Sequence, residues 1–335
     1  MLVSRACWSP CCRRSLLCRS EADTAPNGGG HMTHASLLSR YAKRLVLSDS
    51  VPELRRRAQG SYAQIVDLLD EILVAHTHAI CFENLDVTAF RARGDLKAVA
   101  IDVDGAADKL LTDGRGGYCH EHAALIRGVV TELGLSAHPI LARVHLGDGQ
   151  TAPGALTHQA TIVDLDGRRL LIDPGFGGGT PEAALELSES AAARMTPHGE
   201  HRLVPVRTAL TPQLRADSDW VLQSRTRDDQ EFRTVYAFSE VPRQQMDLEL
   251  ANWFTSTKPG SRFTGPPILA LPLPDGGRVT LEGRRLRRTI GGARPDRQER
   301  TLADAAEFAE VLSTDFRLDL DRDFTDLVWG ATAET

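Results

Sequence analysis

A cysteine, a histidine and an aspartate in this sequence have the types and order needed for nucleophilic acyl transfer. Cys119 follows the segment 115–118, His158 comes 39 residues later, and Asp173 follows after a further 15. In such a triad a thiolate attacks a carbonyl, an imidazole carries the proton and a carboxylate orients the imidazole. With ordinary pKa values of about 8.5 and 6.5, moving the proton from cysteine to histidine costs roughly 2.7 kcal/mol. Asp173 must therefore supply much of that energy.

A hairpin is predicted to place the histidine beside the aspartate. Asp166-Gly167 is a strong signal for a two-residue turn between strands over 159–165 and 168–172. Counting outward from this turn, His158 and Asp173 become diagonal neighbours on one face, with Cα atoms roughly 7–8 Å apart. A slip of one residue would put them on opposite faces.

Cys119 is predicted to lie at the start of a helix. Apolar residues recur at helical spacing from 123 to 133, and Gly134 is a stop signal. Helix N-termini favour thiolate over thiol, and Gly116 and Gly117 permit close backbone approach. The alternative is that Cys119 is a small buried apolar residue, as lone intracellular cysteines usually are.

The elements that must hold these residues follow the order helices, strands, then a mixed segment. Helical patterns begin at Leu37 and cover 65–73, and strands are expected over 139–172 and 202–236. A mixed region over 249–289 precedes a final helix near 302–312. The arginines at 284, 285, 287 and 288 are predicted to form a solvated edge strand.

Composition indicates an ordinary soluble globular protein and excludes several classes of protein. A net charge of −6 argues against a nucleic-acid binder, and no apolar run approaches the roughly 20 residues that span a bilayer. Four of six cysteines fall in the first 18 residues, which is not a disulfide framework. We expect a cytoplasmic protein with a disordered leader over 1–33.

Several ordered motifs together resemble the arylamine N-acetyltransferase family, of the bacterial, actinobacterial type. They are Arg-Gly-Gly-Tyr-Cys at 115–119, Phe-Glu-Asn-Leu at 82–85, Asp-Pro-Gly-Phe-Gly at 173–177, and the segment 252–259 containing Asn-Trp-Phe and Ser-Thr-Lys-Pro. The spacing of His158 and Asp173 from Cys119 also fits the family. The resemblance covers roughly residues 36 to 315.

The resemblance implies an α+β fold in three parts around a cysteine-protease-like triad. A helical domain over 34–136 would carry the cysteine, a β-barrel domain over 137–217 the histidine and aspartate, and 218–330 would form an α/β lid. It also implies a ping-pong reaction of xenobiotic metabolism. Acetyl-CoA would acetylate Cys119, and an arylamine, arylhydrazine or N-hydroxyarylamine would then take the acetyl group.

The resemblance also suggests contacts for both substrates. The expected CoA-binding residues are Thr157, Gly175, Gly177, Thr257 and Lys258. The expected acceptor-binding residues are Phe82, Tyr118 and Phe176. We expect no metal, because neither His76, His78 and Cys81 nor Cys119, His120 and His122 have zinc-ligand spacing. Arg115 and Glu121 are expected to form an ion pair that fixes the cysteine loop.

Departures from the family pattern leave other functions open. Cys81, His120, Ala123, Pro174 and Lys258 replace residues that are usual in the family. An amide synthase that closes macrolactam rings would keep the triad, need no CoA and act on a carrier-protein thioester. A transglutaminase-like cysteine hydrolase and an inactive binding homologue are the remaining alternatives.

Overall fold

The computed structural model describes residues 35–145, 147, 149–226, 231–291 and 296–334. Within it, Ala35–Thr335 is one compact unit. The predicted leader over 1–33 lies outside the described residues. No helix among the described residues is long and apolar enough to cross a membrane.

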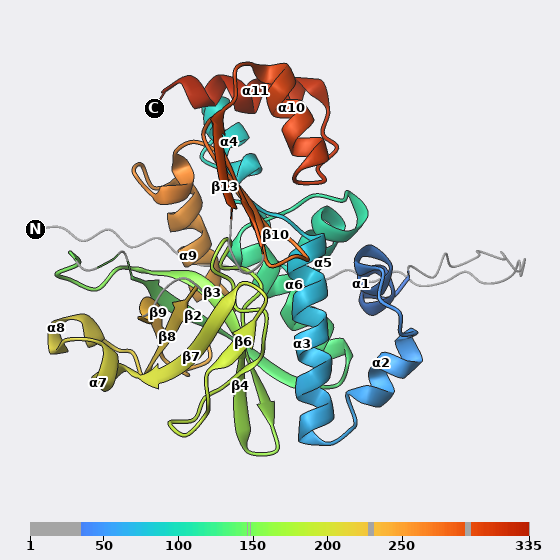
Figure 1. Ribbon diagram of the computed structural model, residues 1–335, viewed down its shortest axis with the longest axis vertical. Helices are drawn as coiled ribbons and strands as arrows, with labels where there is room; N and C mark the ends of the chain where they lie inside the picture. Colours follow the sequence, from blue (N-terminus) through green and yellow to red (C-terminus); the bar gives the residue numbers. More distant parts are fainter. Residues whose placement is uncertain (1–34, 146, 148, 227–230, 292–295, 335) are drawn as a thin grey trace, which may run out of the picture. The chain divides into compact units, whose positions relative to one another are not determined.

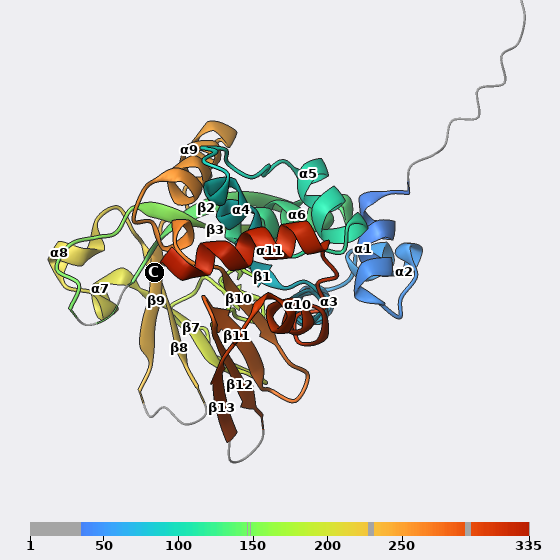
Figure 2. The ribbon, with the colours of Figure 1, turned by 90° about the horizontal axis from the view of Figure 1, so that it is seen from above.

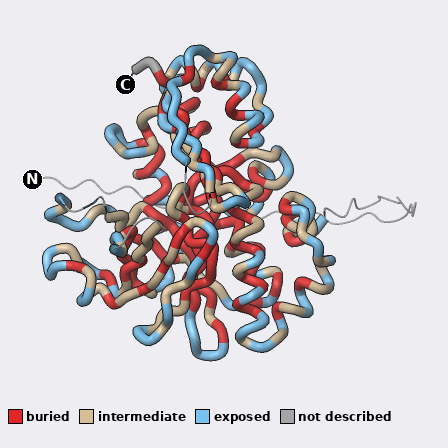
Figure 3. The backbone as a smooth tube through the Cα atoms, in the orientation of Figure 1, coloured by how far each residue is buried: buried red, intermediate tan, exposed pale blue. Residues whose placement is uncertain are grey.

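The first part of this unit is helical, as the sequence predicts. Its elements are α1 (Leu37–Leu45), α2 (Val51–Arg57), α3 (Tyr62–Ala79), β1 (Phe82–Glu83), α4 (Leu85–Ala92), α5 (Val103–Ala107), the π-helical turn η1 (Asp108–Thr112) and α6 (Cys119–Glu132). The apolar stripe of α3, including Leu69 and Ile72, packs with Leu125 and Ile126 of α6 in one core. Figure 3 shows that buried residues are concentrated in the middle of the molecule, where α3 and α6 lie in Figure 1.

The middle of the chain forms an antiparallel sheet in the order β5-β4-β3-β2-β9-β8-β7-β6. Its strands are β2 (Ser136–Val144), β3 (Leu156–Leu165), β4 (Arg168–Ile172), β5 (Leu185–Glu186), β6 (Arg194–Thr196), β7 (Gly199–Pro205), β8 (Trp220–Arg225) and β9 (Arg233–Phe238). The sheet curls until β5 contacts β7, which gives a nearly closed barrel. Two short helices, α7 (Val206–Ala209) and α8 (Pro212–Arg215), connect β7 to β8. The predicted domain boundary at 217 therefore falls between two paired strands of one sheet.

The hairpin of β3 and β4 has the predicted register. Leu165 pairs with Arg168 across the turn. Asp166 and Gly167 both have positive φ, at 51° and 78°. A type I′ turn requires this conformation at both central residues, which is why the Asp-Gly pair specifies it.

The last part of the chain builds a second sheet, in the order β1-β10-β11-β12-β13, together with helices. Its elements are α9 (Gln245–Thr257), η2 (Arg262–Thr264), β10 (Ile268–Pro272), β11 (Arg278–Glu282), β12 (Arg285–Ile290), β13 (Asp296–Thr301), α10 (Ala305–Thr314), α11 (Arg322–Gly330) and η3 (Ala331–Glu334). α11 packs against α4 of the helical part (Figure 2). β1 brings the Phe-Glu-Asn-Leu motif to β10.

The expectation of an edge strand at the arginine run is wrong. β12 lies between β11 and β13, and the edge is β13. Arg285 and Arg287 remain exposed while Leu286 is buried, because only one face of this sheet packs on the core. Arg288 shares the face of Leu286 but is exposed and pairs with Asp315 at 2.6 Å.

Candidate active site

The turn that carries Cys119 is held against β1. Gly117 N donates to Cys81 O at 3.1 Å, and Glu83 N donates to Gly117 O at 2.7 Å. A Cβ on Gly116 would lie 2.2 Å from the Cys81 carbonyl oxygen, which no side chain could tolerate. The predicted need for glycine before the cysteine therefore comes from contact with this strand. Cys119 follows as the first residue of α6 and is 3% exposed.

The expected ion pair between Arg115 and Glu121 is wrong. Arg115 instead lies 3.0 Å from both Glu83 and Asp86, because the turn runs beside β1. Glu121 lies 2.7 Å from Lys109 and accepts a hydrogen bond from Tyr118 N at 3.0 Å. Lys109 also contacts Asp86 at 2.7 Å, so all of these charges form one network around the turn.

The hairpin presents His158 and Asp173 as a buried pair. His158 Nε2 lies 2.8 Å from Asp173 Oδ2, and the two residues are 3% and 1% exposed. The same carboxylate oxygen accepts from the Tyr236 hydroxyl at 2.9 Å, and Oδ1 accepts from Gly175 N at 3.1 Å. Three donors therefore hold Asp173 as a carboxylate facing the imidazole.

His158 also reaches Cys119. Burial by itself lowers the pKa of His158, but the Asp173 charge and hydrogen bonds to Asp173 and Cys119 outweigh it and raise that pKa to about 10. The Cys119 Sγ lies 3.9 Å from the carbonyl oxygen of Thr157. The structure thus brings together the three predicted triad residues, from α6, β3 and the segment after β4.

Gly175 allows the aspartate segment to sit on the cysteine turn. A Cβ at this position would lie 3.1 Å from Cys119 Cα and 3.0 Å from His122 Cβ. Such contacts are tighter than ordinary van der Waals packing. The glycine therefore serves close packing between two backbone segments of the site. Gly177, at a φ of +86°, similarly lies against the Phe82 ring.

Of the three expected acceptor residues, Phe176 contacts a triad side chain, whereas Phe82 and Tyr118 have other partners. Phe176 meets the His158 ring edge-on at 5.1 Å between centroids. Phe82 stacks on the His122 ring at 6.3 Å, behind the cysteine turn. The hydroxyl of Tyr118 instead bonds to Asn252 of α9, and the ring is buried.

The expected CoA-binding residues lie in three places. Gly175 and Gly177 follow Asp173. Thr157 lines a pocket of about 320 Å³ together with Leu250 and Phe254 of α9. At the end of that helix the Thr257 hydroxyl donates to Trp253 O, and the exposed Lys258 lies 5.4 Å from the Phe254 ring centroid.

Sequence reasoning missed Tyr236 and Gln159. Tyr236 contacts the His158 ring at 4.9 Å as well as Asp173, and Gln159 Oε1 lies 2.9 Å from His120 Nδ1. Burial lowers the pKa of His120 to about 4, so this substituted residue is neutral and bonded to β3. No local motif marks Tyr236, since only the pairing of β9 with β2 brings it to the site.

Comparisons with known proteins give the family. A family model described as N-acetyltransferase matches residues 65–325. The chain is 32% identical over 262 residues to the arylamine N-acetyltransferase of Escherichia coli, covering 78% of this chain and 85% of that protein. It is 36% identical over 267 residues to the arylamine N-acetyltransferase of Mycobacterium bovis, covering 78% and 86%. The chain belongs to the arylamine N-acetyltransferase family.

Solved structures of this family share the fold. The Mycobacterium marinum arylamine N-acetyltransferase in complex with CoA aligns with a TM-score of 0.72 at 30% identity, covering 88% of this chain and 99% of that chain. The Salmonella typhimurium enzyme aligns with a TM-score of 0.73 at 27% identity, covering 89% and 99%. The predicted family, the enzyme class and the α+β fold are confirmed.

Proposed function

We propose that this protein transfers an acetyl group from acetyl-CoA to an arylamine, arylhydrazine or N-hydroxyarylamine through a thioester on Cys119. The observation that carries the proposal is the buried His158–Asp173 pair, 2.8 Å apart, beside a cysteine at the first residue of a helix. The ordinary pKa of cysteine is about two units higher than that of histidine, so the proton would stay on the thiol. The pKa of about 10 at His158 reverses that order.

In the first half-reaction the Cys119 thiolate attacks the thioester carbonyl of acetyl-CoA. Glu121 N and His122 N already donate to Tyr118 O, so the N–H groups of Cys119 and His120, at the very start of α6, are the donors we assign to the developing oxyanion. The imidazolium of His158 then gives its proton to the departing CoA sulfur. The products are CoA and acetyl-Cys119.

In the second half-reaction the amine attacks the acetyl-Cys119 carbonyl. His158, now neutral, accepts the proton from the amine as the new amide bond forms. The carbon–sulfur bond breaks and the Cys119 thiolate returns beside protonated His158. Asp173 stays ionised throughout, held by its hydrogen bonds from Tyr236 and Gly175.

The substrates are assigned to the two sides of the triad. Phe176 provides an aromatic edge beside His158 for the acceptor ring. The Thr157 pocket, lined by apolar α9 residues, is the assigned route for the pantetheine arm of CoA, with Lys258 available to its phosphates. We assign 218–330 to the lid domain, although its first two strands complete the barrel. A cytoplasmic location stays a prediction.

Intact-protein mass spectrometry tests the thioester. Acetyl-CoA alone should add one acetyl group to the wild-type chain and none to the Cys119→Ala variant. Acetylation that persists in the variant would overturn the mechanism. Addition of an aniline or hydrazine should then discharge the acetyl group, with one acetylated amine formed per CoA released.

The same assay separates the amide-synthase alternative. Amide synthases would load Cys119 from a carrier-protein thioester and fail to load from acetyl-CoA. Loading by acetyl-CoA and discharge by simple aromatic amines would exclude that function as the main activity.

A further inference from the structure

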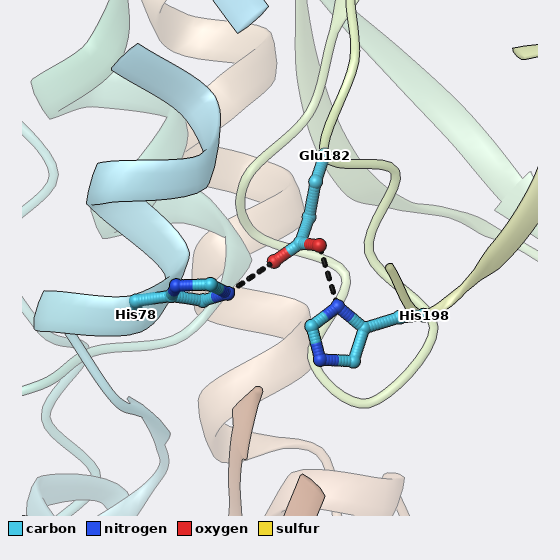
Figure 4. A group of neighbouring side chains, drawn as sticks. All are labelled: His78, Glu182 and His198. Carbon is cyan, nitrogen blue, oxygen red and sulfur yellow. Dashed lines mark hydrogen bonds and ion pairs between the residues drawn. The ribbon is translucent and has the colours of Figure 1, made fainter. Parts of the chain in front are cut away.

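Two histidines and a glutamate outside the triad meet at one point, as Figure 4 shows. His78 comes from the end of α3, Glu182 from the segment after β4, and His198 from the turn between β6 and β7. One nitrogen of each histidine and a carboxylate oxygen of Glu182 all lie within 4.8 Å of one another. We propose that these three residues bind a divalent transition-metal ion of the Zn²⁺ class.

The spacing of the ligand atoms suits such an ion. His78 Nε2 lies 3.1 Å from Glu182 Oε1, and His198 Nδ1 lies 2.5 Å from Glu182 Oε2. Zinc bonds of roughly 2.0–2.2 Å in a tetrahedron place neighbouring ligand atoms about 3.4 Å apart. Each histidine now faces a different oxygen of Glu182, so the carboxylate must turn and the His198 contact must lengthen before both nitrogens and one oxygen share an ion. Two histidines and one glutamate form a known kind of three-ligand zinc set, whose fourth position takes water.

Both histidine rings have the orientation that a ligand needs. His198 Nε2 lies 2.8 Å from Gly277 O and 3.1 Å from Leu273 O. Because carbonyl oxygens only accept hydrogen bonds, Nε2 carries a hydrogen and Nδ1 is the nitrogen turned to Glu182. Metal-binding histidines commonly donate their second nitrogen in this way. His78 turns its Nε2 toward the Glu182 carboxylate, at 3.1 Å from Oε1.

A hydrogen bond also holds the Glu182 carboxylate in place. The site lies beside a pocket. The Glu182 side chain is fully buried, and its Oε1 accepts a hydrogen bond from the Thr77 hydroxyl at 2.7 Å. His198 lines a pocket of about 690 Å³, and the His78 side chain is 17% exposed, so the cluster borders solvent. A bound ion would join α3 to two loops of the barrel, the segment after β4 and the turn between β6 and β7.

Equilibrium dialysis of the full chain against Zn²⁺ tests the proposal. Cys119 and the four cysteines of the first 18 residues are replaced by serine in all samples, because thiolates bind zinc themselves. This parent should bind one zinc per chain. His78→Gln, Glu182→Gln and His198→Gln should each weaken binding at least about tenfold.

His138→Gln is the matched control. His138 also pairs with a carboxylate, lying 3.0 Å from Asp164, but no third ligand joins this pair in the part of the chain that the structure describes. This variant should keep the parent's zinc affinity. Zinc should raise the Tm of the parent and of His138→Gln, and leave the Tm of His78→Gln unchanged.

Two measurements keep the test decisive if a ligand variant fails to fold. Thr77→Val leaves all three ligands in place and should weaken zinc binding by about tenfold through the freed carboxylate. Co²⁺ bound to the parent should give visible ligand-field bands without a thiolate charge-transfer band. Equal zinc affinity in the parent and the folded variants, or no Co²⁺ bands in the parent, would overturn the proposal.

Discussion

Replacing Asp173 with asparagine should return the proton from His158 to Cys119. The carboxylate now accepts hydrogen bonds from His158 Nε2, the Tyr236 hydroxyl and Gly175 N, at 2.8, 2.9 and 3.1 Å. Asparagine keeps the size of the side chain but removes its charge. If the amide nitrogen turns toward His158, it also forces the hydrogen onto the ring nitrogen that faces the cysteine.

The size of the effect follows from the pKa of His158. That pKa is about 10 although burial lowers it, and Asp173 supplies the largest opposing contribution. Without the carboxylate, burial should bring the pKa below the ordinary value of about 6.5. The change exceeds three pKa units, or about 4 kcal/mol. An ordinary thiol with a pKa of about 8.5 would then hold its proton at pH 7.

Two assays report whether Cys119 or His158 holds the proton. Stopped-flow acetylation by acetyl-CoA should slow by about 10⁴-fold in Asp173→Asn, the loss known for this change in a related kind of triad. Thiolate absorbance at pH 7, taken as the difference from Cys119→Ser, should be weaker in Asp173→Asn than in the wild type.

Tyr236→Phe is the control for this experiment. It removes one hydrogen bond to Asp173 but keeps the carboxylate and the ring packing on His158. Its acetylation rate should fall by less than about a hundredfold, the equivalent of one hydrogen bond to a charged group. A thiolate signal at pH 7 as strong in Asp173→Asn as in the wild type would refute the reasoning.

Three further changes probe the packing, the pH dependence and the charges around the site. Gly175→Ala should lower the free energy of unfolding by about 1–3 kcal/mol and slow acetylation, because the new methyl group meets backbone of the cysteine turn. Burial lowers the pKa of His122 to about 4, so the unfolded chain alone binds this proton between pH 6.5 and 4. Stability should fall as the pH falls through that window, by up to about 3.4 kcal/mol, and His122→Gln should reduce this dependence in urea unfolding. Lys109→Met should cost about 3–5 kcal/mol, because it leaves the buried Glu121 carboxylate without its partner.

Each of these changes has a control. Gly178→Ala lies in the same segment, but its new methyl group would approach nothing closer than 3.9 Å, so it should keep wild-type stability. His138 is partly exposed, and His138→Gln should leave the acid dependence in place. Lys97→Met removes an exposed lysine and should change the free energy of unfolding by less than about 0.5 kcal/mol. A Gly175→Ala variant as stable as Gly178→Ala would contradict the packing argument.

The local sequence was enough to predict the hairpin and the helix of the active site. The Asp166-Gly167 turn alone sets the register of β3 and β4, because both of its residues must adopt positive φ. That register places His158 beside Asp173. The apolar spacing after Cys119 likewise predicts α6, since one face of the helix must be buried. The link between Cys119 and the hairpin came only from resemblance to a family.

Long-range packing determined the other contacts of the site, because charged and polar side chains pair with groups that lie near them in the folded chain. Arg115 pairs with Glu83 since β1 runs beside the cysteine turn, and nothing near Arg115 in the sequence shows this. Tyr236 reaches Asp173 only because β9 pairs with β2. The same holds for His78, whose partners Glu182 and His198 lie far along the chain. Turn and helix patterns fix local geometry, whereas contacts between distant elements form only when the elements pack together into the folded core.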